Sequence, residues 1–344
     1  MSLPAPLFGM TADGFASAVD GLPGGRERAL RVYRDAWRAL GLPDGLEACW
    51  RDAVDAAVPA PAEVHTEDGP AGTTAKCRLR LADGSTIEMV SIPVAGGQSS
   101  TLCVSTQVGC RQACAFCETG RQGLHRQLTP AEIAGQWVAA RRLGWQPRNL
   151  VFMGMGEPLD NTENLIAALQ ALTDPRGPDL ARERFTVCTA GLPAGLERLA
   201  ALGWRRLGLS ISLNAADDAT RDRLMPRNRQ TPLAALQAAL AAYPKRRNFA
   251  LGVNWCLLPG INDSRADVRR LAAFCAPLGR VMVNVIPYNP GRQPLTRAPE
   301  ACEVERFIGW LQEEGLPVRC RRPRGRSIMA ACGQLGGPSA PPGS

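Results

Sequence analysis

Apolar residues recur three and four positions apart between about residues 14 and 58, which is the spacing of helices that bury one face. The run from Arg26 to Trp37 shows this pattern best and places its arginines on the opposite face. A second helix is predicted over Leu46–Val58, because the Pro59-Ala60-Pro61 stretch then interrupts the pattern. The first part of the chain is therefore predicted to be helical.

A period of two replaces the helical period after these prolines. Apolar and polar residues alternate over 77–81, Asp83 and Gly84 give a turn signal, and alternation resumes from Thr86 to Ile92. This pattern predicts a β-hairpin. We therefore expect residues 1–95 to form a small N-terminal accessory domain that consists of helices and this hairpin.

Short apolar runs and amphipathic segments alternate through the rest of the chain, which predicts strand–helix units around a parallel sheet. One helix begins after Thr129, where Pro130 and Glu132 complete a capping box with proline in the first turn. Further helices are expected at 233–243, 265–275 and 300–314, and strands at 102–108, 149–153, 185–189, 207–213, 251–257, 281–287 and 318–320.

About six such units predict an α/β fold of the open, partial (β/α)6 barrel type, since a closed barrel needs eight. Ligands of such folds bind at the carboxyl ends of the parallel strands. This domain is expected over residues 96–335. The tail over 336–344 is rich in Gly, Pro and Ser and is predicted to be disordered.

Composition narrows the class of protein. The chain has 344 residues, 45% of them hydrophobic, with no run long enough to span a membrane and no signal peptide at its start. We therefore expect a cytoplasmic protein without membrane contact. In that compartment its twelve cysteines point to cofactor or catalytic chemistry rather than to a disulfide framework. The net charge of +8 comes almost wholly from arginine, which suits phosphate contacts but also an ordinary solvated surface.

Three cysteines, Cys110, Cys114 and Cys117, lie within eight residues of one another. Three thiolates on one short loop hold three irons of a [4Fe-4S] cluster and leave the fourth iron open for a small molecule. The alternative is structural zinc, which needs a fourth protein ligand and is usually bound by paired cysteine knuckles. The chain offers two histidines, His65 and His125, and no second close pair of cysteines, so the cluster is favoured.

Polar residues and glycines follow several predicted strands. Gly154 to Pro158 come after the strand that ends at Met153, and there Glu157 is placed to accept a hydrogen bond from a ligand ammonium group. Ser212-Leu213-Asn214 and Asn289 end two further strands. Taken alone, each of these is also typical of an ordinary polar loop.

Two cysteines outside the loop are candidates for chemistry. Cys103 precedes the loop by seven residues, and Cys332 lies near the C-terminus beside Gly333. A buried structural thiol is the usual role of an isolated cysteine. Cys332, however, lies in a segment without a regular pattern, and such a segment can bring a thiol into an active site.

Five stretches of the chain together resemble the RlmN/Cfr-type radical S-adenosylmethionine (SAM) RNA adenine methyltransferases: 101–117, 154–158, 211–213, 286–290 and 331–335. The resemblance covers about residues 85–335 and implies a radical SAM barrel. It implies a [4Fe-4S] cluster on Cys110, Cys114 and Cys117 and SAM bound by Gly156, Glu157, Cys188, Ser212, Leu213, Asn214 and Asn289. Two of these depart from the family pattern, which has histidine at Asn214 and serine at Cys188.

The resemblance also implies a mechanism. SAM methylates Cys332, a second SAM yields a radical that takes hydrogen from the methyl group, and the resulting carbon radical adds to an adenine ring carbon. Cys103 then resolves the protein–RNA crosslink by forming a disulfide with Cys332. Glu88 matches the general-base position of the family, although by pattern alone it would be an exposed carboxylate on an alternating strand.

The implied substrate is an adenosine of 23S ribosomal RNA, methylated at C2, with transfer RNA as a further substrate. Methylation of the same adenine at C8 remains open. An electron donor such as flavodoxin and a monomeric state are also implied. A radical SAM enzyme for a non-RNA substrate, or an iron–sulfur protein that only binds RNA, would not need Cys103 and Cys332. Basic residues expected to contact RNA are Arg319, Arg321, Arg322, Arg324 and Arg326, the 245–247 cluster, and Arg28, Arg31 and Arg34.

Overall fold

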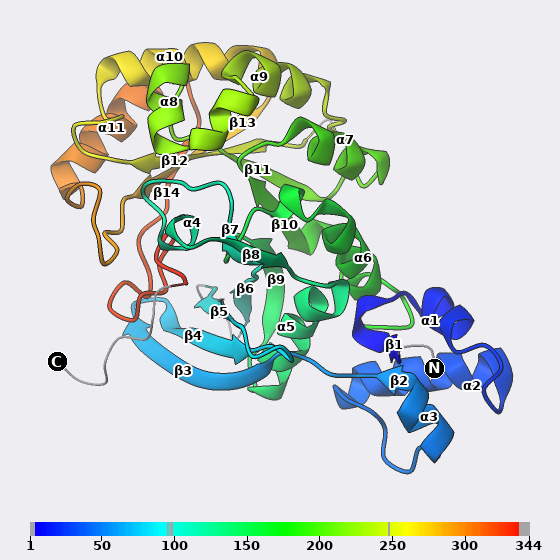
Figure 1. The fold of residues 1–344 in the computed structure, drawn as a ribbon. Helices are drawn as coiled ribbons and strands as arrows, with labels where there is room; N and C mark the ends of the chain where they lie inside the picture. Colours follow the sequence, from blue (N-terminus) through cyan, green and yellow to red (C-terminus); the bar gives the residue numbers. More distant parts are fainter. Residues whose placement is uncertain (1–3, 95, 97–98, 247, 337–344) are drawn as a thin grey trace.

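One ten-stranded sheet organises the molecule in the computed structural model, which describes residues 4–94, 96, 99–246 and 248–336. Its parallel part runs in the order β6, β9, β10, β11, β12, β13 and β14, as Figure 1 shows. Six strand–helix units precede β14, so the predicted α/β fold with a partial (β/α)6 barrel is confirmed. The parallel strands are β6 (Ser100–Cys103), β9 (Pro147–Phe152), β10 (Phe185–Thr189), β11 (Gly208–Ser212), β12 (Leu251–Leu257), β13 (Val281–Pro287) and β14 (Val318–Cys320).

The expected strand over 102–108 is in fact two strands. After Cys103 the chain leaves the sheet, because Ser105 donates its backbone N–H to Gln136 Oε1 at 2.8 Å instead of to a neighbouring strand. It then forms β7 (Gln107–Cys110), which pairs antiparallel with β8 (Gly123–Gln127) outside the main sheet. This small ribbon carries the first cysteine of the loop at its end.

Three antiparallel strands extend the same sheet beyond β6: β5 (Thr86–Pro93), β4 (Gly72–Arg80) and β3 (Ala60–Gly69). The predicted hairpin is confirmed as β4 and β5, and the sheet runs through the boundary expected at residue 95. The helix expected over Leu46–Val58 was wrong beyond α3 (Ala48–Ala53), which β2 (Val54–Asp55) follows; β2 pairs with β1 (Ala5–Pro6). Pro61 does not stop the chain from forming β3, because an edge strand tolerates a residue without an N–H.

The N-terminal helices α1 (Ala12–Ala18) and α2 (Gly25–Ala39) pack on the outside of the barrel (Figure 1). The Trp37 ring lies 4.8 Å from Phe8 and 6.0 Å from Trp137 of helix α5 (Pro130–Arg142), measured between ring centroids. The capping box predicted at Thr129 is present at the start of α5. None of the helices in the described ranges has the length and apolar content for crossing a bilayer. The remaining helices are α4 (Glu118–Arg121), α5 (Pro130–Arg142), α6 (Thr162–Leu172), α7 (Pro193–Ala201), α8 (Asp218–Leu224), α9 (Leu233–Ala242), α10 (Arg265–Cys275) and α11 (Ala301–Glu313), with 3-10 turns at Leu7–Gly9, Pro158–Asp160, Arg182–Arg184, Pro226–Gln230 and Ala276–Leu278.

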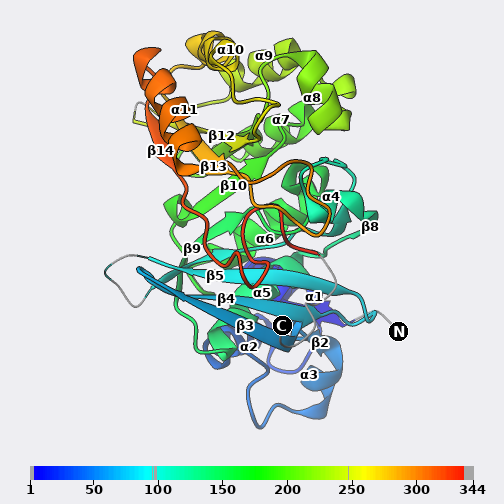
Figure 2. The ribbon, with the colours of Figure 1, turned by 90° about the vertical axis from the view of Figure 1, so that its left-hand side faces the viewer.

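The segment after β14 returns from the far edge of the sheet toward β4 and β5 (Figure 2). Glu67 of β3 binds this C-terminal segment, because its carboxylate accepts hydrogen bonds from the backbone N–H groups of Gly325 at 2.7 Å and Ser327 at 2.8 Å. Arg324 donates to the carbonyl of Pro93 at 2.6 Å. These contacts determine where Cys332 lies. Residues 337–344 of the tail expected to be disordered fall outside the described residues.

Candidate active site

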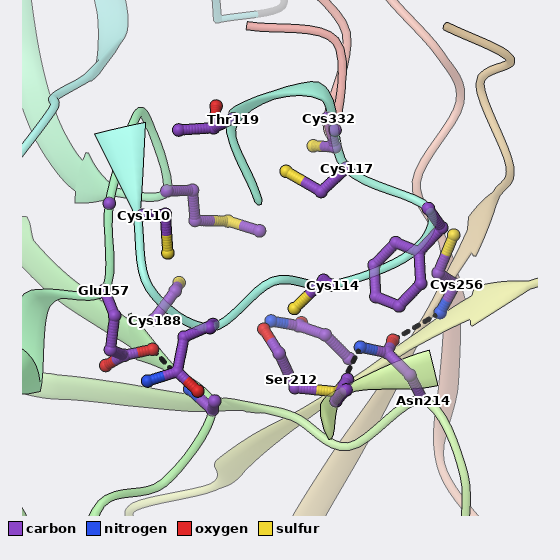
Figure 3. A pocket seen from close by; sticks show the side chains of 18 of the residues that line it. Cys110, Cys114, Cys117, Thr119, Glu157, Cys188, Ser212, Asn214, Cys256 and Cys332 are labelled. Carbon is purple, nitrogen blue, oxygen red and sulfur yellow. Dashed lines mark hydrogen bonds between the residues drawn. The ribbon is translucent and has the colours of Figure 1, made fainter. Parts of the chain in front are cut away.

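The three-cysteine loop connects β7 to α4. Cys110 is the last residue of β7, and the N–H of Cys117 donates to the carbonyl of Cys114 at 3.1 Å, which closes the turn. Ala115 donates to the carbonyl of Leu224 in α8 at 2.9 Å. Figure 3 shows the three cysteines around one cavity, so the loop presents three thiols to a common space.

That cavity brings together most of the site residues expected from the sequence. Cys188, Ser212 and Asn214 line it from the ends of β10 and β11, and Glu157 from the turn after β9. Cys332 lines it from the C-terminal segment. Members of the expected set that the cavity wall includes are Cys110, Cys114, Cys117, Gly156, Glu157, Cys188, Ser212, Asn214 and Cys332, whereas Cys103, Glu88, Leu213 and Asn289 are not part of it.

Burial makes the loop thiols poor acids in the absence of a counter-charge. It raises the pKa of Cys110 to about 12 and the pKa of Cys114 well above its usual value. Within the described ranges, no three His, Cys, Asp or Glu side chains converge as ligands of a single ion. A [4Fe-4S] cluster supplies the positive charge that buried thiolates require, so the chemistry of the three buried thiols fits the cluster expected from the sequence.

Glu157 is held by backbone and side-chain donors around the turn after β9. Its carboxylate accepts from Ala190 N at 2.8 Å, Leu159 N at 3.0 Å and Thr189 Oγ1 at 2.5 Å. Burial nevertheless raises its pKa to about 7, because desolvation of the charge outweighs these hydrogen bonds.

Gly156 has a tertiary role that its position in the sequence did not reveal. It has a φ of +101°, and a Cβ there would lie 2.5 Å from Cβ of Gln107. The glycine is thus required for the close approach of this turn to Gln107 of β7. Gln107 in turn accepts the backbone N–H of Glu157 at 2.7 Å, which positions the turn.

Some of the residues at the strand ends line the cavity, and others stabilise the structure around it. Leu213 is fully buried in the core, so only its backbone is available, whereas Ser212 and Asn214 face the cavity. Asn214 adopts a left-handed φ of +60°, and its Oδ1 accepts the N–H of Cys256 at 2.9 Å. Asn289 instead donates to the carbonyl of Cys332 at 3.3 Å. We conclude that Asn289 supports the Cys332 segment in this structure.

Cys332 is placed by bonds between its segment and the three-cysteine loop. Glu118 donates its N–H to the carbonyl of Gly333 at 2.8 Å, and Thr119 Oγ1 donates to the carbonyl of Leu335 at 2.6 Å. The exposed surface of Cys332 faces the cavity beside Cys117 (Figure 3). The thiol is nonetheless surrounded by protein, and this desolvation raises its pKa against the opposing charge of Arg321.

Cys103 lies at the end of β6, behind the cavity wall, and is 8% exposed. Burial raises its pKa, and the thiols of Cys332 and Cys188 raise it further, which places these three sulfur atoms in one neighbourhood. Burial also raises the pKa of Cys188 to about 12, and there the positive charge of Arg321 acts in the opposite direction. Arg321 therefore provides a favourable field for a thiolate at any of the three positions.

Glu88 is a buried carboxylate, 3% exposed, and not the exposed strand residue that its pattern indicates. It lies 3.3 Å from the ammonium group of Lys76 and accepts the N–H of Gly336 at 2.8 Å. Lys76 also donates to the carbonyl of Met329 at 3.4 Å. The pair thus connects β4 and β5 to both ends of the segment that carries Cys332.

Replacing Lys76 by methionine should lower the free energy of unfolding by about 3 kcal/mol, because it leaves the Glu88 carboxylate buried and unpaired. The matched control is Arg78→Met on the same strand, whose ion pair with Glu63 is partly exposed and should contribute less than about 1 kcal/mol. Urea unfolding followed by tryptophan fluorescence measures both. Equal losses in the two variants would contradict the assigned role of the buried pair.

Sequence patterns gave no signal for two further residues that line the cavity, or for one buried residue behind it. Asn254 of β12 is 1% exposed, and its Oδ1 accepts from Ser210 Oγ and Asn284 Nδ2, each at 3.0 Å. Its Nδ2 is buried without a partner in the described structure, and Asn254 is one of the residues that line the cavity. Cys256 also lines the cavity. Arg221 lies behind it, buried in α8.

The basic run before Cys332 divides between structural and free side chains. Arg321, Arg324 and Arg326 bond to Asn284, to the carbonyl of Pro93 and to Asn289, respectively. Arg319 and Arg322 are exposed and have no recorded partner among the described residues. Arg28 and Arg31 of α2 pair with Glu47 and Glu27, and Lys245 donates to the carbonyl of Leu278, while Arg247 lies outside the described residues.

Comparison with known proteins shows which family this chain belongs to. A model of the radical SAM superfamily matches residues 104–274. A probable RNA methyltransferase of Sorangium cellulosum is 44% identical over 310 residues, which cover 88% of this chain and 76% of that protein. A probable dual-specificity RNA methyltransferase RlmN of Protochlamydia amoebophila is 36% identical, and the match covers 97% of this chain and 94% of that protein. The chain belongs to the RlmN/Cfr-type family of radical SAM RNA methyltransferases.

A solved structure agrees with this family assignment. The crystal structure of a radical SAM methyltransferase from Sphaerobacter thermophilus superimposes with a TM-score of 0.87 at 34% identity, covering 96% of this chain and 99% of that one. The superfamily match begins just after Cys103 and ends before Cys332. It therefore contains the cluster loop and Glu157, whereas the two additional thiols lie in the parts that only the longer matches cover.

Proposed function

We propose that this enzyme methylates a ring carbon of adenosine in RNA, at C2 of a 23S ribosomal RNA nucleotide, with transfer RNA as a second substrate. The observation that carries the proposal is the placement of Cys332 in the same cavity as Cys110, Cys114 and Cys117, with Cys103 close behind it. The RNA methyltransferases among its relatives support RNA as the substrate.

A [4Fe-4S] cluster on Cys110, Cys114 and Cys117 and SAM at its open iron would supply the methyl group and the hydrogen-abstracting radical. Glu157 is proposed to accept the ammonium group of SAM, and Ser212 and the unpaired amide of Asn254 to face its polar atoms. Cys188 and Asn214 complete the wall where the family has other residues. Gly156 leaves backbone free beside the ligand.

The other residues of the chain are proposed to carry the methyl transfer itself. An adenine C2 or C8 atom is electron-poor and does not attack the SAM methyl group directly, so a carrier on the protein is needed. Cys332 is proposed to carry the carbon and Cys103 to release the product by forming a disulfide with it. Glu88 is proposed to take the proton from the adenine carbon. The backbone N–H of Gly336 bonds to the Glu88 carboxylate, so the Cys332 segment must move to let the adenine ring reach Glu88.

Nucleoside mass spectrometry tests this function. Ribosomal and transfer RNA from cells that lack the protein would be compared with RNA from the same cells expressing it, under conditions where a low-potential donor such as flavodoxin is present. Appearance of 2-methyladenosine supports the proposal, and 8-methyladenosine would instead establish the alternative regiochemistry. No change in either RNA pool would exclude these substrates. A Cys114→Ser variant, which should lose its iron, checks that the product requires the cluster.

The affinity for SAM should fall as the pH decreases through about 7, because SAM's ammonium group requires the ionised form of Glu157, whose pKa burial raises to about 7. Below that value the affinity should drop about tenfold per pH unit. The stability of the ligand-free fold should depend on pH in the opposite direction. Because the pKa of Glu157 is raised by burial, the fold should become less stable as the pH rises through 7, where the Glu157 carboxylate must be buried in its charged form. Equilibrium dialysis with labelled SAM measures the binding.

The matched comparison uses Glu157→Gln and Glu163→Gln, the second being an exposed carboxylate on α6. The first variant should bind SAM weakly at every pH, without the step near 7, and the second should retain the step. A pH step that persists in Glu157→Gln would show that another group accepts the ammonium.

A further inference from the structure

Arg221 is a buried cation without an anionic partner. It is 3% exposed, and its guanidinium donates to the carbonyl oxygens of Leu213 at 3.0 Å, Ala190 at 2.9 Å and Ser212 at 3.4 Å. A fourth bond goes to the side-chain oxygen of Asn228. All four acceptors are neutral, and in the described structure no carboxylate lies within ion-pair distance of Arg221. Burial lowers its pKa to about 10, so the group remains charged at neutral pH.

The charges of Asp218, Asp222 and Glu157 oppose the effect of burial on the pKa of Arg221, but their oxygens bond to other groups. Asp218 and Asp222 accept from Asn228 Nδ2 at 2.8 and 2.7 Å, and Asp218 also accepts the N–H of Leu233 at 2.9 Å. Glu157 bonds to the backbone and side chains of its own turn and of β10. Because an unpaired buried cation is unfavourable, a negative charge close to Arg221 is expected in the working protein.

The three-cysteine loop is where that negative charge would lie. Ala115, the residue after Cys114, donates its N–H to the carbonyl of Leu224, one turn beyond Arg221 in α8. Arg221 also lines a second cavity together with Gln112 of the loop and Ala190. It is not part of the wall of the cavity around the three cysteines, and most of its N–H groups are already bonded, so it faces the loop through the protein instead of touching a ligand.

We propose that Arg221 is a positioning residue that stabilises the reduced, more negative form of the cluster and so raises its reduction potential. The inference rests on the proposed function, because it needs the cluster on Cys110, Cys114 and Cys117. Three thiolates outweigh the charge of the oxidised cluster, and one further electron makes the site more negative still. A cation that is fixed in the protein interior stabilises the added electron more than a solvent-exposed cation does, because its charge is less screened.

The test is a reductive titration of the reconstituted holoprotein with one-electron redox mediators, followed by absorbance and by electron paramagnetic resonance. In Arg221→Gln, the ratio of reduced to oxidised cluster at a fixed potential should fall about tenfold, which corresponds to about 59 mV for one electron. Arg221→Lys keeps the charge and should shift the ratio much less. Arg223→Gln removes the same charge from an exposed position on the same helix and should leave it unchanged.

Iron content and SAM binding separate the outcomes. A wild-type protein that holds no cluster would contradict the proposed function, whereas a loaded Arg221→Gln with an unchanged potential would overturn this inference alone. A loss of SAM affinity at unchanged potential would also overturn it, because Arg221 would then act as a ligand contact. If Arg221→Gln does not fold, Arg221→Met decides, since it removes the charge, keeps the length and apolar stem of the side chain, and should lower the potential in the same direction. An unaltered potential in that variant refutes the proposal.

Discussion

Replacing Cys332 by alanine should reduce methylation of RNA by about 10³-fold or more, because the methyl carrier of the proposed mechanism is removed. The thiol is not one of the three loop cysteines, and its segment is held by one backbone hydrogen bond from Glu118 and a side-chain hydrogen bond from Thr119. The variant should therefore keep its fold and its iron. Methylated nucleosides measured by mass spectrometry, together with iron content, report the two properties separately.

The matched control is Cys49→Ala, which removes an exposed thiol from α3 on the N-terminal helices. It should methylate RNA at the wild-type rate. If Cys332→Ala were equally active, the carrier role would be wrong, and the placement of Cys332 in the cavity would then be structural. If the variant lost iron as well, its inactivity would not bear on the carrier, and Cys332→Ser would replace it in the test.

Replacing Cys103 by serine should abolish turnover in a different way, by leaving the RNA attached to the protein. In the proposed resolution step, the Cys103 thiolate attacks the sulfur of Cys332 and forms a Cys103–Cys332 disulfide. The electron pair of the broken sulfur–carbon bond stays on the methylene carbon of the adduct, which takes up a proton and becomes the methyl group. A serine hydroxyl cannot form that disulfide. A covalent protein–RNA species should therefore accumulate, and denaturing gel electrophoresis before and after ribonuclease treatment detects it.

The double variant Cys103→Ser, Cys332→Ala provides the control for this result, because no adduct can form without the carrier. Cys188→Ala tests the neighbouring thiol that also faces the cavity. Adduct in the single variant only, with Cys188→Ala still turning over, supports Cys103 as the resolving residue. If Cys103→Ser released methylated RNA at the normal rate, another thiol would have to resolve the adduct, and Cys188 would be the first to examine.

Local sequence determined the elements of the barrel, because each is specified by residues within one element. The strands at 185–189, 251–257, 281–287 and 318–320 and the helix at 265–275 have the predicted bounds. Each is a short apolar run or amphipathic segment with clear ends, and the Thr129 cap is likewise a local device. The three-cysteine loop could be recognised for the same reason, since its three thiols are neighbours in the sequence.

Tertiary structure decided what depends on partners distant in the sequence. The hairpin was predicted as part of an accessory domain, but its free edge pairs with β6, and Pro61 is tolerated only because β3 lies at the sheet edge. Glu88 looked exposed by alternation, because nothing near it in the sequence indicates that Lys76 and Gly336 cover it. Asn289 turned out to bond to the Cys332 segment, while Asn254 provides the unpaired donor.

The sequence by itself thus determined the order of strands and helices, the three-cysteine loop and the thiols available for chemistry, all of which depend on residue type and local period. Only the tertiary structure decided which of these groups share one cavity, and what charge surrounds them. Arg221 shows the difference: its sequence context is that of an ordinary helix surface, and its burial follows from four acceptors on three separate segments. Desolvation and electrostatics depend on every neighbouring atom, and a linear pattern does not contain those neighbours.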